Sequence, residues 1–120
     1  MNKARDLPAE SRLKAFVQRY LSPAHRDHPA TGCFLGALGT ELARCDEHTR
    51  ALATEGYQGL VDVIAGSLRK TQKKKVQREA QYIVSSMIGA LVSSRIVTHR
   101  DLSDSILKNT ADRIIQEYCS

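Results

Sequence analysis

The sequence lacks the features that would place it in several common classes of protein. Its first segment, MNKARDLPAESR, is polar and contains no apolar signal core. Its longest apolar segment is interrupted by serines, and it is shorter than the roughly 20 residues that span a bilayer. We therefore expect a cytoplasmic protein with no membrane partner.

Cysteine is scarce and does not follow a disulfide or zinc-finger pattern. The three cysteines, Cys33, Cys45 and Cys119, are odd in number, widely spaced and free of any C-x-x-C pair. This usage predicts reduced thiols with mainly structural roles.

Catalytic motifs are absent as well. The sequence contains no Ser-His-Asp spacing, no nucleophile elbow, no phosphate-binding loop and no paired carboxylates suited to acid–base chemistry. Asp101 and Asp104 fit better as a capping pair at the start of a helix. We expect a protein that is not an enzyme and that carries no cofactor.

The excess of positive charge is modest and partly local. The net charge is +5, and much of it comes from one basic cluster of residues 69–78: Arg69, Lys70, Lys73, Lys74, Lys75 and Arg78. Such a cluster is either a solvated helix junction or a phosphate-binding patch. It contains no aromatic residues, which argues against binding of single-stranded nucleic acid by stacking.

What is present predicts one all-α domain. With 42% hydrophobic residues, the 120-residue chain can bury a core, behind a flexible lead of residues 1–7. Apolar residues at helical spacing predict an antiparallel bundle of five helices. The expected helices cover about Pro8–Leu21, Thr31–Arg44, a segment from an N-cap at Asp46 to about Thr71, a segment from about Lys74 to Val97, and a last one that begins at Asp101. The intervening segment SPAHRDHPAT is expected to be a loop.

Residues 80–97, AQYIVSSMIGALVSSRIV, predict an assembly. This helix is apolar on almost every face and carries a stripe of small residues, so it must be buried on more than one side. One side faces the chain's own core, and the other needs a second molecule. We expect a homodimer in which the last two helices of each subunit form a four-helix interface. Its expected residues are Ile88, Gly89, Leu91, Val92, Arg95, Ile106, Thr110 and Ile114.

Three glycines interrupt the third expected helix. Gly56, Gly59 and Gly66 each weaken it by about 1 kcal/mol relative to alanine. They indicate close packing, a bend, or room for a bound molecule.

The ordered set of segments resembles a known family. Gly32-Cys33 opens the second helix, Gly89-Ala90-Leu91 with Arg95 lies in the fourth, and Leu102-Ser103-Asp104 with Ile106-Leu107 opens the fifth. Together, over about residues 8–118, they resemble the C-terminal regulatory domain of TetR/AcrR-type transcriptional repressors. The resemblance implies effector sensing and dimerisation. The helix-turn-helix head of that family has no counterpart here, so we expect no direct DNA contact by this chain.

Inward-facing aromatic and apolar residues are the candidate effector pocket. Aromatic rings with a few hydroxyls suit a small apolar or aromatic molecule. The alternative is that the same residues fill a solid core, which would make the chain a ligand-free interaction module. The expected pocket residues are Phe16, Tyr20, Phe34, Leu38, Tyr57, Val61 and Met87.

A second alternative is a metal- or thiol-dependent sensor. His25, His28 and Cys33 form the pattern H-x2-H-x4-C, whose residue types are zinc ligands, with Cys45 or His48 as a conceivable fourth. The spacing is not a standard one, so we expect no metal. Cys33 alone would lie near a helix N-terminus, which lowers thiol pKa values and favours redox sensing.

Overall fold

The computed structural model describes residues 8–28, 43–68 and 73–119, with the backbone alone at positions 73 and 74. Within these ranges every regular element is a helix: α1 (Ala9–Tyr20), α2 (Pro23–Asp27), α4 (Glu47–Gly66), α5 (Lys73–Ile96) and α6 (Arg100–Tyr118). The all-α prediction is confirmed. The helix expected over Thr31–Arg44 lies almost entirely outside the described residues.

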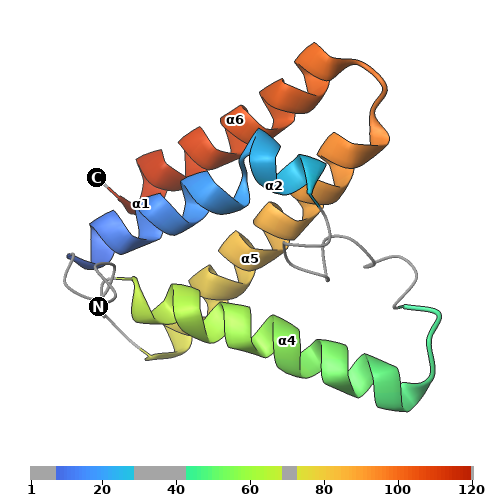
Figure 1. Cartoon of the computed structure of the whole chain (residues 1–120). Coiled ribbons are helices and arrows are strands. Elements are labelled where there is room, and N and C mark those ends of the chain that lie inside the picture. Colours follow the sequence, from blue (N-terminus) through green and yellow to red (C-terminus); the bar gives the residue numbers. More distant parts are fainter. Residues whose placement is uncertain (1–7, 29–42, 69–72, 120) are drawn as a thin grey trace.

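The helices form two packed layers around α5. Helices α5 and α6 make an antiparallel hairpin, α1 lies along α6, and α4 crosses the first half of α5 (Figure 1). Helix α2 continues from the end of α1 and lies against the last part of α5. The core therefore sits where α1, α4, α5 and α6 meet.

The apolar spacing of each helix explains that core. On α5, the residues Ile83, Val84, Met87 and Leu91 recur at helical spacing and are fully buried. They meet residues from the other three long helices, and the cluster also contains Leu13, Val17, Tyr20, Leu21, Val61, Ile64, Ala65, Leu68, Ala80, Ala90, Leu107, Ala111 and Ile114.

Residues 22–28 differ from the expected loop. Pro23–Asp27 form a one-turn helix, because the side chain of Ser22 caps it and Pro23 occupies its first turn. The Ser22 Oγ accepts a hydrogen bond from the His25 amide at 3.1 Å and donates one to the Arg19 carbonyl at 2.8 Å. The same Ser-Pro pair therefore ends α1 and begins α2.

The ends of α4 are partly as predicted. Asp46 is the N-cap, and its Oδ1 accepts a hydrogen bond from the Thr49 amide at 2.8 Å. The C-terminal end comes earlier than expected, at Gly66, whose carbonyl accepts a hydrogen bond from Arg12 at 3.2 Å. A side chain of α1 thus satisfies one of the last carbonyls of α4.

The predicted capping pair of α6 is wrong. Helix α6 begins at Arg100, one residue before Asp101, and its N-cap His99 makes no side-chain capping bond. Asp104 instead accepts a hydrogen bond from Arg26. Asp104 is therefore committed to a tertiary contact and not to the local backbone.

Candidate functional site

Five of the seven expected pocket residues lie together in the structure. Tyr20, Val61 and Met87 are buried in the core from α1, α4 and α5, and Phe16 and Tyr57 are half-buried against it. The other two, Phe34 and Leu38, lie outside the described residues. Three helices therefore contribute to one apolar cluster with two phenol groups.

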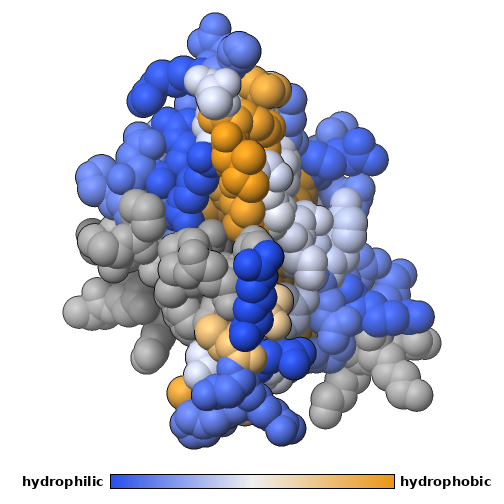
Figure 2. All heavy atoms as spheres, turned by 90° about the vertical axis from the view of Figure 1, so that its right-hand side faces the viewer, coloured by the Kyte–Doolittle hydropathy of each residue, from blue (hydrophilic) through white to orange (hydrophobic). Residues whose placement is uncertain are grey.

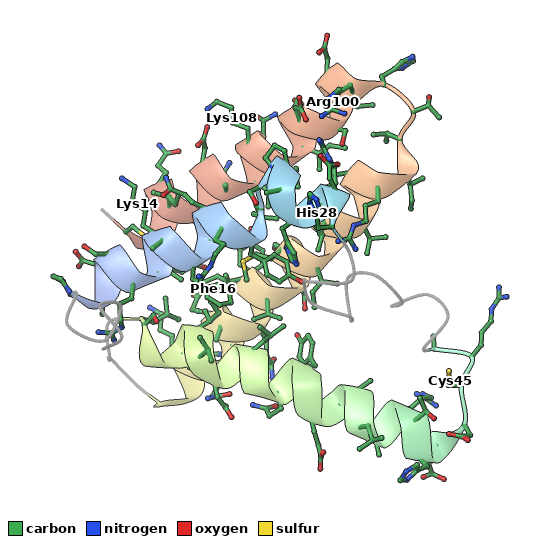
Figure 3. All side chains as sticks on the ribbon, viewed as in Figure 1. Lys14, Phe16, His28, Cys45, Arg100 and Lys108 are labelled. Atoms are coloured by element: carbon green, nitrogen blue, oxygen red, sulfur yellow. The ribbon has the colours of Figure 1, made fainter. Side chains whose placement is uncertain are left out.

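The aromatic rings are ordered by each other and by α2. The rings of Phe16 and Tyr20 stack with centroids 6.2 Å apart, and the imidazole of His25 meets the edge of Tyr20 at 4.7 Å. Figure 3 shows Phe16 on the side of α1 that faces α4. There it also lines a surface hollow of about 290 Å³ with Val63 of α4. The contact between α1 and α4 therefore leaves an open surface hollow beside Phe16.

Tyr57 gives this cluster a polar partner on α5. Its hydroxyl lies 2.7 Å from the Ser85 Oγ and donates a longer hydrogen bond of 3.4 Å to the Gln81 carbonyl. The ring packs on the core while the hydroxyl reaches the side of α5. Tyr57 thus links α4 to α5 by both packing and hydrogen bonding.

A groove between α5 and α6 lies on the outward side of the hairpin. It has a volume of about 570 Å³ and is floored mainly by small residues of α5, with larger side chains of α6 at its edge. Its lining residues are Tyr82, Ser85, Ser86, Gly89, Ala90, Ser93, Ile106, Asn109, Thr110, Arg113 and Ile114.

Apolar surface is exposed near the end of this hairpin. Figure 2 shows a hydrophobic strip on the face where α5 turns into α6, next to a band of intermediate hydropathy. The large exposed apolar side chains of the two helices are Tyr82 at 51%, Ile96 at 71% and Leu102 at 49%. Ile96 and Leu102 flank the turn between the two helices, whereas Tyr82 lies apart from them, near the start of α5 and in the groove.

The structure divides the expected dimer residues into two groups. Gly89, Ile106, Thr110 and Ile114 line the groove. Ile88 and Val92 are half-buried, and Ile88 packs against the core.

Leu91 and Arg95 require a correction. Leu91 is fully buried inside the protomer, so a partner cannot contact it without unpacking the core. Arg95 donates hydrogen bonds to the carbonyls of His25 and Arg26, both at 3.1 Å. Both residues serve the fold of the single chain. Leu91 is therefore no longer a candidate dimer contact, and a dimer contact of Arg95 stays a prediction.

Gly89 has no close packing neighbour among the described residues of the protomer. A Cβ atom added at this position would meet nothing within 4 Å. The same holds for Gly59 and Gly66 of α4, so close packing does not explain those glycines either. Glycine weakens a helix interior by about 1 kcal/mol relative to alanine. At position 89, no contact among the described residues of the single chain offsets this loss.

The two histidines of the suggested metal loop bind backbone carbonyls. The Nδ1 of His25 lies 2.7 Å from the Tyr20 carbonyl, and that of His28 lies 2.9 Å from the Ala24 carbonyl. A carbonyl only accepts, so Nδ1 carries the proton in each ring. Across residues 8–28, 43–68 and 73–119, no three His, Cys, Asp or Glu side chains gather as a metal site. Cys33 lies outside these ranges.

A buried arginine connects α2 to the hairpin, and the sequence analysis did not predict this contact. Arg26 is 6% exposed, and its Nη1 donates to the Ser103 Oγ at 2.9 Å and to the Asp104 Oδ1 at 2.5 Å. Its Nε donates to the Asp27 Oδ1 at 2.9 Å. These hydrogen bonds, first with Asp27 and then with Asp104, raise the pKa of Arg26, so it stays charged.

The fold is that of an all-helical domain, and a comparison with known families assigns it to one of them. The family model for "Tetracyclin repressor-like, C-terminal domain" matches residues 9–109, and the chain belongs to this family. Domains of this family generally regulate transcription, dimerise and bind small effectors, and they are in general not enzymes. The resemblance drawn from the sequence is thereby confirmed.

Other comparisons add no relative. Neither a curated protein nor a solved structure matches the chain. In the part of the chain that the structure describes, no helix has the length and apolar character needed to cross a membrane.

Proposed function

We propose that the chain is the effector-sensing domain of a TetR-like regulator and that it forms a homodimer through the outward side of α5 and α6. The observation that carries the dimer is Gly89. It is exposed in the lining of the groove, and none of the described residues of the protomer comes close enough to require a glycine there. A helix of a second subunit that approaches α5 closely is the simplest reason for a glycine there.

The energetics favour the same surface. Ile106 is half-buried and Tyr82 is half-exposed at the groove, and burying an aliphatic side chain completely contributes about 1.5–3 kcal/mol. A two-fold interface buries each such residue twice. Ser86 and Ser93 have small side chains, so the groove leaves room for side chains of a second hairpin.

The effector site of this proposal is the aromatic cluster of α1, α4 and α5. Phe16, Tyr20, Tyr57, Val61 and Met87 offer apolar surface, and the Tyr57 hydroxyl offers one hydrogen-bonding group. This combination suits a small apolar or aromatic molecule. Phe34 and Leu38 remain part of the proposed site on the sequence pattern alone.

The proposed mechanism is a population shift. Helix α4 packs on α5 at the core and through Tyr57, so an effector between them displaces α4 relative to the dimerising hairpin. In a regulator, two α4 helices that move on a fixed hairpin pair change the spacing of the DNA-binding heads.

The dimer is tested by sedimentation of the purified chain at micromolar concentration. Gly89→Leu should convert the dimer to monomer, because the new side chain fills the groove floor. Gly59→Leu is the matched control, since that glycine is also in a helix interior with nothing within 4 Å of an added Cβ. A monomeric wild type, or equal association of both variants, would refute the interface.

The effector site is tested by a thermal-shift screen of apolar and aromatic compounds. A ligand at 100 times its Kd stabilises the folded form by about 2.7 kcal/mol, which is readily detected. A hit should lose affinity in Phe16→Ala and Tyr57→Ala but not in Gln18→Ala, an exposed change on α1 away from the hollow at Phe16. A screen without hits, with a dimer still present, would favour the ligand-free interaction module.

A further inference from the structure

A second, polar hollow shares no lining residue with the hollow between α1 and α4 that contains Phe16. It has a volume of about 320 Å³ and is formed where α2, the end of α5 and the start of α6 meet. The residues that matter for its chemistry are Arg26, Asp27, Arg95, Thr98, Arg100 and Ser103. All of them belong to the described part of the chain, and none belongs to the aromatic cluster proposed as the effector site.

The charge of Arg26 in this hollow is already balanced. Its guanidinium bonds Asp27 on one side and Asp104 on the other, at 2.9 and 2.5 Å. Ser103 accepts from Arg26 and donates to the Ser94 carbonyl at 2.6 Å. Arg26 therefore builds the wall of the hollow and has little capacity left for a ligand.

Arg95 is different, because nothing described balances its charge. Its Nε and Nη2 donate to two carbonyls at the end of α2, which are neutral groups. Its Nη1 is buried and has no hydrogen-bond partner. Among the described residues no carboxylate lies within ion-pairing distance of Arg95. An unpaired, partly buried guanidinium is unfavourable, and such groups in native proteins call for an explanation.

The start of α6 adds to the positive character of the hollow. Its N-cap makes no side-chain capping bond, so the first amides of a 19-residue helix lack that partner. Arg100 is 75% exposed, and its only described carboxylate partner, Asp27, is 3.8 Å away. Asp101 in the same turn offsets part of the helix dipole. The attraction for anions therefore comes mainly from Arg95 and Arg100. Figure 3 shows Arg100 at this end of the hairpin.

We propose that this hollow binds a small oxyanion, the carboxylate or phosphate group of a low-molecular-weight ligand. Arg100 supplies an exposed guanidinium and Thr98 a hydroxyl donor, while Arg95 adds its unbalanced charge from the wall of the hollow. The volume is at the lower end of the range for ligand sites, which fits a small anion or the anionic end of a larger molecule.

Binding there has a structural consequence for the regulator. The anion balances the charge of Arg95, whose guanidinium holds the end of α2 through the carbonyls of His25 and Arg26. It therefore stabilises one position of α2 against the hairpin. This is a second input, separate from the apolar effector, and it does not depend on whether the aromatic cluster binds a ligand.

The test is a titration of the full chain with sodium phosphate and, separately, sodium succinate, against sodium chloride at equal ionic strength. Amide chemical shifts and the melting temperature are recorded together. We expect saturable shifts at residues 97–103 and a higher melting temperature with at least one of the two oxyanions. The stronger of the two identifies a phosphate or a carboxylate ligand.

Variants localise the binding. Arg100→Gln removes an exposed charge and should weaken the oxyanion about two- to fivefold while folding normally. Lys108→Gln is the matched control, because Lys108 is also 75% exposed on α6 but lies farther along the helix. Arg95→Gln should also weaken binding, and Arg95→Lys should recover part of it, because lysine keeps the charge but not both hydrogen bonds to the carbonyls of α2.

Three results would overturn the proposal. One is the same response to chloride as to both oxyanions, which means screening only. Another is equal weakening by Arg100→Gln and Lys108→Gln, which means a diffuse effect of charge. The third is a set of shifts outside residues 26–28 and 94–104. Sedimentation of the same samples reports the dimer separately, so a failure here is distinguishable from a failure of the proposed dimer.

Discussion

The inward and outward faces of α5 are both uncharged over several turns, but they carry side chains of different size. The inward face has large residues, and Ile83, Met87 and Leu91 are fully buried. The outward face has Gly89 and Ser93 exposed at the floor of a groove. Both faces lack charge over several turns, yet only the inward one is used by the protomer.

The difference shows how one helix serves both folding and assembly. Large side chains stabilise the core because they bury apolar area in proportion to their size. Small side chains bury little area themselves, but they let another backbone come close. Substitutions on the inward face should therefore change the free energy of unfolding, and substitutions on the outward face should change association.

The largest effect is expected on the inward face. Leu91→Ala removes a fully buried side chain and should lower the free energy of unfolding by about 2–5 kcal/mol. Urea denaturation at fixed protein concentration measures this loss. Ser93→Ala, two residues along on the outward face, should stay within about 0.5 kcal/mol of the wild type. Equal losses in the two variants would contradict the division of α5 into two faces.

The next effect concerns the link from α2 to the hairpin. Arg26→Met should lower the free energy of unfolding by about 1–3 kcal/mol, because Ser103 and the two carboxylates lose a charged donor. The control Lys108→Met removes a lysine that is 75% exposed, pairs only with Asp112 in the described structure and lies outside the groove. A loss as small as in the control would show that the Arg26 network is not stabilising.

The pH dependence of stability tests the same Arg26 network. The hydrogen bond from Arg26 holds the pKa of Asp27 below its ordinary value of about 3.9. A lowered pKa in the folded state means that this stabilisation is complete above the unfolded pKa and disappears as the pH falls through the folded one. Stability of the wild type should therefore fall faster below about pH 4 than that of Arg26→Met. Parallel acid titrations of the two proteins would contradict this assignment.

Sequence patterns were sufficient for elements that depend on neighbours in the chain. The periodicity of α1, α5 and α6 and the cap at Asp46 were predictable, because each involves residues within one or two turns. The contact of Arg26 with Ser103 joins residues 77 positions apart, and no local pattern indicates it. The prediction of Leu91 as a dimer contact was wrong for a related reason. Periodicity places Leu91 on an apolar face of the helix but does not say which of the two apolar faces points inward.

A smaller effect is expected at the contact between α4 and α5. Tyr57→Phe removes the hydroxyl that lies 2.7 Å from the Ser85 Oγ and should lower the free energy of unfolding by about 0.5–1.5 kcal/mol. A double-mutant cycle with Ser85→Ala isolates the pair, since each single variant removes the same hydrogen bond. Additive losses would mean that the two hydroxyls do not interact. The same variant should weaken a polar effector but hardly affect a hydrocarbon.

The smallest change, and the most discriminating, is a single methyl group at Gly89. In the protomer an added Cβ meets nothing within 4 Å at Gly89 or at Gly59. Helix propensity alone then predicts that Gly89→Ala and Gly59→Ala each stabilise the dissociated chain by up to about 1 kcal/mol. Under associating conditions the two should diverge, because only Gly89 faces the proposed partner helix. Gly59→Ala should keep the wild-type dimer dissociation constant, while Gly89→Ala should raise it.

Urea unfolding at low protein concentration measures the stability of the dissociated chain, and sedimentation at high concentration measures the dimer dissociation constant. Identical behaviour of the two variants in both experiments would leave the outward face of α5 without a partner, whereas divergence in sedimentation alone assigns the glycine to assembly.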